Sequence, residues 1–248
     1  IEIASRVDLV YDFALPPLIL HSLFTSDVTS LVNWLTISPR NCITVLDTHD
    51  GIGIIDVGPM DGKSGLLQDK EIDNLVETIH QKSNGESIKA TGAAASNVDL
   101  YQVNCTYYDA LGKDDLDYLI ARAIQFFAPG IPQVYYTGLL AETNDMALLS
   151  ETNVGRNINR PYLNQDKVEN LLQKSVTRAL TRLIMIRNES DAFNGVFSVT
   201  GDKSKLELSW QHNETSASLT VDLSDKRAVI RLSDSKSNEE INLASLLN

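Results

Sequence analysis

The chain has 248 residues, of which 43% are hydrophobic and 22% are charged, so its composition is that of a globular protein and excludes a disordered one. Its formal net charge of −12 argues against nucleic acid or an anionic membrane as a partner, because both require a basic face. No run reaches the roughly 18 apolar residues of a membrane-spanning helix, and two cysteines are too few for a disulfide framework, so we expect a reducing, cytoplasmic location.

Strand-like and helix-like segments alternate along the chain before Phe193. Short apolar runs without alternation are typical of buried parallel strands, and they occupy residues 7–13, 42–46 and 131–136. Apolar residues at helical spacing indicate helices over residues 17–24, 69–83, 114–127 and 167–188. This order predicts a parallel α/β fold.

Three further expectations concern the middle of the chain. Asp69 precedes a helical apolar pattern and is expected to cap that helix. The segment 83–96 is polar and rich in small residues, so we expect a loop there. Residues 98–103 are expected to form a short strand or an extended loop.

The pattern changes after about Phe193. Four short runs alternate apolar and polar residues and are separated by turn-forming residues: 196–199, 206–210, 217–221 and 228–232. Alternation of this kind is typical of antiparallel strands with one buried face. We therefore predict an antiparallel β module at the end of the chain.

The densest polar cluster follows the strand over 42–46. Asp47, His49 and Asp50 come directly after it, and in α/β barrels the carboxyl ends of the strands carry the active site. A simple turn is the structural alternative, since Asp and Gly are common turn residues. A metal site is disfavoured because the other histidines show no ligand spacing to this cluster.

Two loop segments offer further candidates. Residues 99–102 (Asp-Leu-Tyr-Gln) combine an aromatic ring with hydrogen-bonding groups that suit a sugar, although an ordinary alternating strand explains them equally well. Arg156 and Arg160 lie in a polar loop, and arginine can bind a carboxylate or phosphate bidentately. For an isolated arginine, a surface salt bridge is the favoured alternative. Gly51 and Gly53 do not make a dinucleotide loop, because Asp56 stands where the third glycine is required.

Six segments together resemble the sucrose phosphorylases, a branch of the α-amylase superfamily. They are YDFALPPLILHSL, TVLDTHDGIGIIDVG, ATGAAASNVDLYQVNCTYYDALG, FFAPGIPQVYYTGLLA, NDM followed by NVGRNINR, and IRNESDAFNG. The resemblance covers essentially the whole chain. The His-Asp pair after a barrel strand is shared across the superfamily, whereas the DLYQ and GRNINR segments resemble the phosphorylase branch.

The resemblance implies a (β/α)8 TIM barrel with an inserted subdomain and a C-terminal antiparallel β domain, of which this chain is the C-terminal part. Barrel strands six and seven would occupy residues 1–50, a loop-rich inserted subdomain 51–112, strand eight and the last helices 113–192, and the β domain 193–248. The chain starts at Ile1 rather than Met and directly in an ordered element, so we expect a piece of a longer polypeptide.

The activity that the resemblance implies is retaining transfer of the glucosyl group of sucrose to phosphate, which yields fructose and glucose 1-phosphate by double displacement. The nucleophilic Asp and the acid/base Glu would lie on strands four and five, outside this chain. Within it, Asp50 would be the transition-state stabiliser and His49 would donate to a glucosyl hydroxyl. Arg156 would line the glucosyl pocket. The acceptor subsite, where fructose and phosphate alternate, would be lined by Asp99, Leu100, Tyr101 and Gln102.

The resemblance implies no metal and no organic cofactor, no nucleic-acid or membrane partner, and an enzyme that is compatible with a homodimer. Three alternatives stay open: a related phosphorylase acting on sucrose phosphate or glucosylglycerol, a glucosyl hydrolase, and a non-catalytic truncated fragment. In every case we expect the isolated chain to be inactive, because the catalytic pair is not in it.

Overall fold

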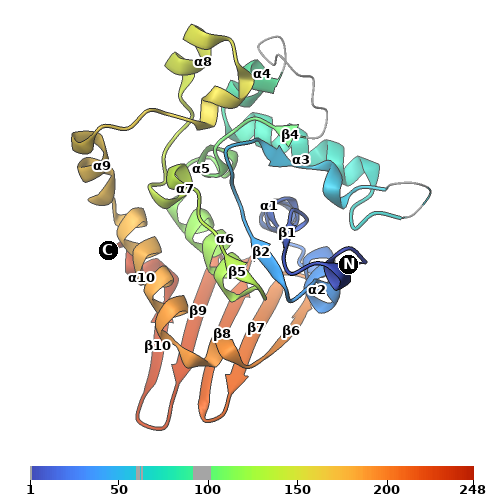
Figure 1. Cartoon of the computed structure of the whole chain (residues 1–248), viewed down its shortest axis with the longest axis vertical. Coiled ribbons are helices and arrows are strands. Elements are labelled where there is room, and N and C mark those ends of the chain that lie inside the picture. Colours follow the sequence, from blue (N-terminus) through green and yellow to red (C-terminus); the bar gives the residue numbers. More distant parts are fainter. Residues whose placement is uncertain (1, 60–61, 63, 92–101) are drawn as a thin grey trace.

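Three short strands form a parallel sheet in the middle of the molecule (Figure 1). β1 (Val10–Asp12) pairs with β2 (Cys42–Thr44), and β2 pairs with β5 (Ile131–Pro132), both in parallel register. The structure is a computed structural model and describes residues 2–59, 62, 64–91 and 102–248. The parallel α/β order expected from the sequence is confirmed.

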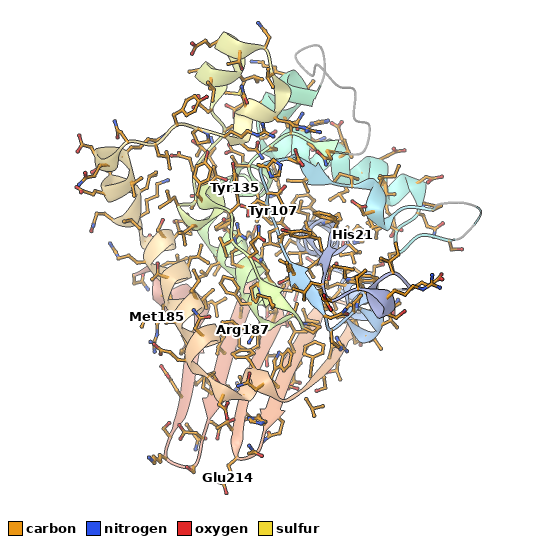
Figure 2. The ribbon with its side chains drawn as sticks, viewed as in Figure 1. His21, Tyr107, Tyr135, Met185, Arg187 and Glu214 are labelled. Carbon is orange, nitrogen blue, oxygen red and sulfur yellow. The ribbon has the colours of Figure 1, made fainter. Side chains whose placement is uncertain are left out.

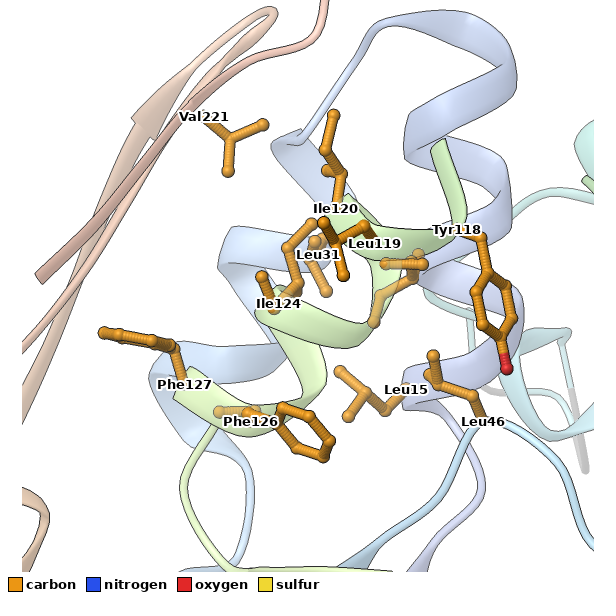
Figure 3. Close-up of a cluster of buried hydrophobic side chains, with 14 of the residues drawn as sticks. Leu15, Leu31, Leu46, Tyr118, Leu119, Ile120, Ile124, Phe126, Phe127 and Val221 are labelled. Atoms are coloured by element: carbon orange, nitrogen blue, oxygen red, sulfur yellow. The ribbon is translucent and has the colours of Figure 1, made fainter. Parts of the chain in front are cut away.

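Helices connect and cover these strands. They are α1 (Leu15–Thr25), α2 (Thr29–Ile37), α3 (Asp69–Lys82), α4 (Glu86–Thr91), α5 (Tyr107–Ala110), α6 (Asp115–Phe127), α7 (Tyr136–Leu139), α8 (Met146–Thr152), α9 (Gln165–Leu172) and α10 (Ser175–Glu189). α6 is central: it packs against α1, α10 and the C-terminal sheet, and all its residues from Asp117 to Phe127 are buried. In Figure 3, Val221 of that sheet lies on one side of α6 and Leu15 of α1 on the other. Within the described residues, no helix has the length and apolar character needed to cross a bilayer.

Five antiparallel strands form the C-terminal sheet, and they are adjacent in sequence order. They are β6 (Val196–Asp202), β7 (Lys205–His212), β8 (Thr215–Asp222), β9 (Arg227–Ser233) and β10 (Asn238–Asn242). The predicted antiparallel module is confirmed, but the prediction of four strands was wrong. β10 was missed because it is an edge strand whose charged residues, such as Glu239 and Glu240, conceal the apolar alternation.

Aromatic and cationic side chains join this sheet to the α/β part. Trp210 of β7 donates from Nε1 to the carbonyl of Phe127 at the end of α6, at 2.8 Å. Arg187 of α10 points toward the sheet (Figure 2), and its guanidinium lies 4.2 Å from the ring centre of Phe193. Burial lowers the pKa of Arg187 to about 10, yet the residue stays cationic at neutral pH. Arg187 also lies 5.7 Å from the ring centre of Trp210, so these contacts join the sheet to α6 and α10.

Several predicted boundaries need correction. The helix over 167–188 is two helices, α9 and α10, because Lys174 turns away from the helix axis and donates to the carbonyl of Ala141 at 2.9 Å. The strand over 131–136 ends at Pro132, because the carbonyl of Gln133 accepts from the side chain of Gln125 and not from a strand. Tyr136 then begins α7 rather than ending a strand.

Two corrections fall in the middle of the chain. Gln68, not Asp69, caps α3, and it forms a reciprocal capping box with Glu71. The segment expected to be a loop contains α4, and the hydroxyl of Ser87 in its first turn lies 2.7 Å from that of Ser83, which precedes the helix. Of the residues 98–103, the structure describes Gln102 and Val103, which form β4.

The parallel sheet leaves one apolar face open. Tyr11 is 48% exposed, Phe13 44% and Ile131 58%, and all three come from β1, β5 or the residue beside them. The Tyr11 and Phe13 rings stack with their centres 5.4 Å apart. Large exposed apolar groups gathered on one face usually mark a surface that another segment covers.

Candidate active site

A cavity of about 490 Å³ opens where the three parallel strands end. Its walls are the segments that follow β1 and β2, together with Gln102 and Gln133. Binding sites in parallel α/β folds lie at the carboxyl ends of the strands, where side chains from several connections converge. The predicted polar cluster therefore lies at the edge of the sheet where the fold places ligands.

Among the described residues, three charged or titratable side chains lie close to the Asp50 carboxylate. Its Oδ1 lies 3.0 Å from Nη1 of Arg156 and 3.4 Å from Nη2 of Arg160. Its Oδ2 lies 3.6 Å from Nε2 of His49. The His49 side chain is 69% exposed and that of Asp50 is 30% exposed, so both remain within reach of a ligand in the cavity. A carboxylate and an imidazole beside two guanidinium groups can exchange hydrogen bonds with sugar hydroxyls.

Asn159 and Arg160 hold the backbone of the turn that carries Asp50. The Asn159 amide donates to the carbonyls of Thr48 and Asp50, at 3.2 and 2.8 Å. Arg160 donates from Nε to the carbonyl of His49, at 2.6 Å. Three successive carbonyls are thus bound by two adjacent side chains. Arg160 was named only as one of two candidate loop arginines, and Asn159 was not foreseen, although both lie in the GRNINR segment.

A buried ion pair lies behind the turn. Arg122 of α6 is fully buried, and its Nη2 lies 2.6 Å from Oδ2 of Asp47. The same guanidinium also donates to the hydroxyl of Tyr118 and to the side chain of Gln125. Burial by itself disfavours the charged form of Arg122, but Asp47 and Tyr118 outweigh that effect and raise its pKa. Arg122 was not foreseen, because an arginine within a helical apolar pattern is usually read as a residue on the exposed side of an amphipathic helix.

Gly138 makes room for this ion pair. A side chain at Gly138 would collide with both the Arg122 guanidinium and the Asp47 carboxylate. Its carbonyl accepts from the Tyr118 hydroxyl at 2.6 Å. α7 can therefore pack onto the pair only with glycine at this position.

Gln102, which the resemblance assigns to an acceptor subsite, lies beside the Asp50 turn. It belongs to β4 (Gln102–Val103), which pairs with β3 (Ile52–Gly53) in antiparallel register. Its Oε1 accepts from the backbone N–H of Gly51 at 3.2 Å. Asp99, Leu100 and Tyr101, the other predicted residues of this subsite, lie outside the described residues. In the described part of the chain, no group of three His, Cys, Asp or Glu side chains is arranged to hold a metal ion.

The curated proteins that the chain resembles, described below, are all phosphorylases. No family model matches the chain. It is 62% identical over 235 residues to sucrose phosphorylase from Agrobacterium vitis, a match that covers 94% of this chain and 48% of that protein. It is 54% identical over 226 residues to sucrose phosphorylase from Bifidobacterium adolescentis, covering 90% and 45% respectively. Glucosylglycerol phosphorylase from Marinobacter adhaerens is 42% identical over 231 residues, covering 92% and 47%.

A solved structure supports the fold. The crystal structure of sucrose 6F-phosphate phosphorylase from Thermoanaerobacter thermosaccharolyticum superposes with a TM-score of 0.83 at 38% identity, and the match covers 97% of this chain and 48% of that one. The chain therefore spans about half the length of the relatives that it matches.

Proposed function

The chain belongs to the sucrose phosphorylase family, and from this premise we propose that it is the C-terminal part of an enzyme that transfers the glucosyl group of sucrose to phosphate. The products are fructose and glucose 1-phosphate. The observation that carries the proposal is the 62% identity to the Agrobacterium vitis enzyme over nearly the whole chain. The polar cluster around Asp50 at the mouth of the cavity supports it independently.

The three parallel strands are, in this proposal, strands six to eight of a (β/α)8 barrel. Residues 1–50 and 113–192 supply barrel segments, 51–112 an inserted subdomain, and 193–248 the β domain. The open apolar face around Tyr11, Phe13 and Ile131 supports this, because the remaining strands of a closed barrel would cover it. The match to about half of a longer phosphorylase structure supports the same arrangement.

The reaction proposed is a double displacement with retention, in which two carboxyl groups lie about 5–5.5 Å apart. Both belong to the part of the enzyme outside this chain. Asp50 then serves as a third carboxylate that binds glucosyl hydroxyls and stabilises the positive charge that develops at the anomeric carbon. His49 donates to a glucosyl hydroxyl, and Arg156 holds Oδ1 of Asp50 in place.

The acceptor subsite is proposed to lie on the inserted segment, at Gln102 together with Asp99, Leu100 and Tyr101. The placement of Gln102 next to Gly51 supports this, since an acceptor must approach the anomeric carbon from outside the glucosyl pocket. Phosphate is a poor match to a chain of net charge −12. Arg156 and Arg160 supply local positive charge beside Asp50, which lines the cavity.

A second candidate is a phosphorylase of the same family with another acceptor. The glucosylglycerol phosphorylase matches 92% of this chain at 42% identity, and the sucrose 6F-phosphate phosphorylase matches 97% of it at 38% identity. The higher identities of the two sucrose phosphorylases favour sucrose. Cytoplasmic location and homodimeric assembly stay predictions of the sequence.

The test uses a hybrid enzyme, in which this chain replaces the matching region of the Agrobacterium vitis sucrose phosphorylase. We expect it to release glucose 1-phosphate from sucrose and phosphate, and the Asp50→Asn hybrid serves as the inactive control. Release of free glucose without glucose 1-phosphate would identify a hydrolase. Phosphorolysis of glucosylglycerol or sucrose 6-phosphate in preference to sucrose would identify the second candidate.

A further inference from the structure

We propose that Asn159 and Arg160 are positioning residues that hold the Thr48–His49–Asp50 turn in its reactive geometry. The inference rests on the proposed glucosyl transfer, which assigns the chemistry to Asp50 and His49. Neither Asn159 nor Arg160 needs to touch the substrate for this role. They act through the backbone that carries the two functional side chains.

The turn has little other support for its carbonyl groups. β2 ends at Thr44, so the carbonyls of Thr48, His49 and Asp50 lie beyond the strand ladder. Backbone carbonyls away from regular structure need side chains or water as partners. Here side chains supply all three bonds, at 2.6–3.2 Å, and Asn159 is only 2% exposed. A turn bonded at three successive residues cannot rotate its peptide planes without breaking at least one bond.

Arginine suits position 160 because it binds two different groups at once. Nε donates to the carbonyl of His49, while Nη2 lies 3.4 Å from Oδ1 of Asp50. The planar guanidinium therefore fixes the Asp50 carboxylate relative to its own backbone. A lysine keeps the charge but offers one flexible nitrogen, which cannot hold both acceptors in one plane.

The two residues are themselves anchored. Ile158, just before them, is fully buried in a small cluster with Ala90 of α4 and Leu149 of α8. The carbonyl of Ile158 accepts from the N–H of Asp145 at 2.7 Å. Gly155 packs so closely on the carbonyl of Ala90 that any side chain would collide with it. Helices α4 and α8 thus form a rigid support for the segment that holds the turn.

The first test measures the turn directly, by amide hydrogen exchange of the segment 46–53 in the folded hybrid enzyme. We expect exchange to be about 10-fold faster or more in Arg160→Lys and in Asn159→Ala, because local opening becomes easier. Arg182→Lys is the matched control, since Arg182 makes a surface pair at the same 3.4 Å distance with Glu239, outside the site. Unchanged exchange in both test variants would overturn the inference, whatever reaction the enzyme catalyses.

The second test is a double-mutant cycle on turnover, with α-glucosyl fluoride as the donor, from which fluoride leaves in place of fructose, and phosphate as the acceptor of the glucosyl group. We expect Arg160→Lys to lower kcat about 10- to 100-fold and to change KM little, because misplacement of a catalytic group acts mainly on the chemical step. In the Asp50→Asn background the same change should lower kcat by less than about 3-fold, since residues that act as a unit are not additive.

The outcomes separate the two proposals. Fully additive effects, or an Arg160→Lys enzyme as active as the Arg182→Lys control, would overturn the positioning role. Fluoride release without glucose 1-phosphate would contradict the proposed function. The double-mutant cycle on fluoride release would still test the positioning role. If the hybrid releases no fluoride, the exchange measurement alone decides.

Discussion

Arg122 and Asp47, which are 75 residues apart in sequence, form an ion pair that is buried from solvent. Asp47 lies three residues before Asp50 in the chain. The pair joins α6, the central helix of the core, to the turn that carries the candidate active site. The Arg122 guanidinium also donates hydrogen bonds to Tyr118 and Gln125, which help to satisfy its buried N–H groups. The position of the turn is therefore coupled to the core packing.

The first prediction concerns this pair. Arg122→Met leaves the Asp47 carboxylate buried without its partner, and we expect it to cost about 3–5 kcal/mol of unfolding free energy. Urea unfolding of the hybrid enzyme measures the loss. The double variant Arg122→Met with Asp47→Leu should recover much of that stability, because it leaves no unpaired charge. A single variant that unfolds at the same urea concentration as wild type would contradict this account.

Asp50 is the subject of the second prediction. Asp50→Asn removes the charge but keeps the size of the side chain, so we expect kcat of the hybrid enzyme to fall about 10²- to 10³-fold. Folding should be preserved, because Asp50 is partly exposed and belongs to no buried pair. Initial rates of glucose 1-phosphate formation together with thermal unfolding check both parts. A kcat within a few-fold of wild type would exclude the stabilising role.

The third prediction separates acceptor from donor residues. Gln102→Ala should slow the step that uses phosphate or fructose more than formation of the glucosyl–enzyme intermediate, since Gln102 lies on β4 and not in the parallel sheet. Separate rates for the two half-reactions measure this. Gln133→Ala is a useful control, because Gln133 lines the same cavity from the position just after β5. Equal losses in both half-reactions would indicate that Gln102 only supports β3 and Gly51.

The fourth prediction concerns alkaline stability. Burial raises the pKa of the Cys42 thiol to about 12, whereas the thiol of an unfolded chain has the ordinary pKa of about 9.0. The folded state therefore keeps this proton where the unfolded state loses it. The contribution of this thiol to the free energy of unfolding is fully present below about pH 9. It is lost as the pH rises toward 12, by up to about 1.4 kcal/mol per pH unit for one such group.

Urea unfolding at several pH values between 8 and 11 checks this. Cys42→Ala should show a shallower loss above about pH 9 than wild type, because it lacks this titration. Buried Tyr107 and Tyr118, whose pKa values burial also raises, act in the same direction in both proteins and cancel in the comparison. Identical slopes would mean that Cys42 ionises normally in the folded chain.

The fifth prediction is that residues 1–248 alone do not catalyse phosphorolysis. The open face around Tyr11, Phe13 and Ile131 should make the isolated chain bind a hydrophobic dye and associate at high concentration. Glucose 1-phosphate release from sucrose and phosphate is the assay, with the hybrid enzyme as the active control. Sustained turnover by the isolated chain would mean that it contains a nucleophile that we have not identified.

The amino-acid sequence alone predicted those features that depend on neighbouring residues. Apolar runs identified the strands β1, β2 and β5, because a strand that is buried on both faces has consecutive apolar side chains. The helix predicted over 114–127 was found because its apolar residues recur at helical spacing, and the structure adds Asp114 as its cap. The polar residues after β2 identified the candidate site, since the end of a buried strand is itself a local feature.

Tertiary structure decided the rest, because it depends on contacts between residues far apart in the chain. The bonds from Asn159 and Arg160 to the Asp50 turn span 109 to 111 residues, and no local pattern specifies them. The division of the helix over 167–188 follows from a contact with Ala141, and the edge strand β10 from pairing with β9. Local propensity sets which elements form, but the free energy of packing sets where they end and which side chains meet.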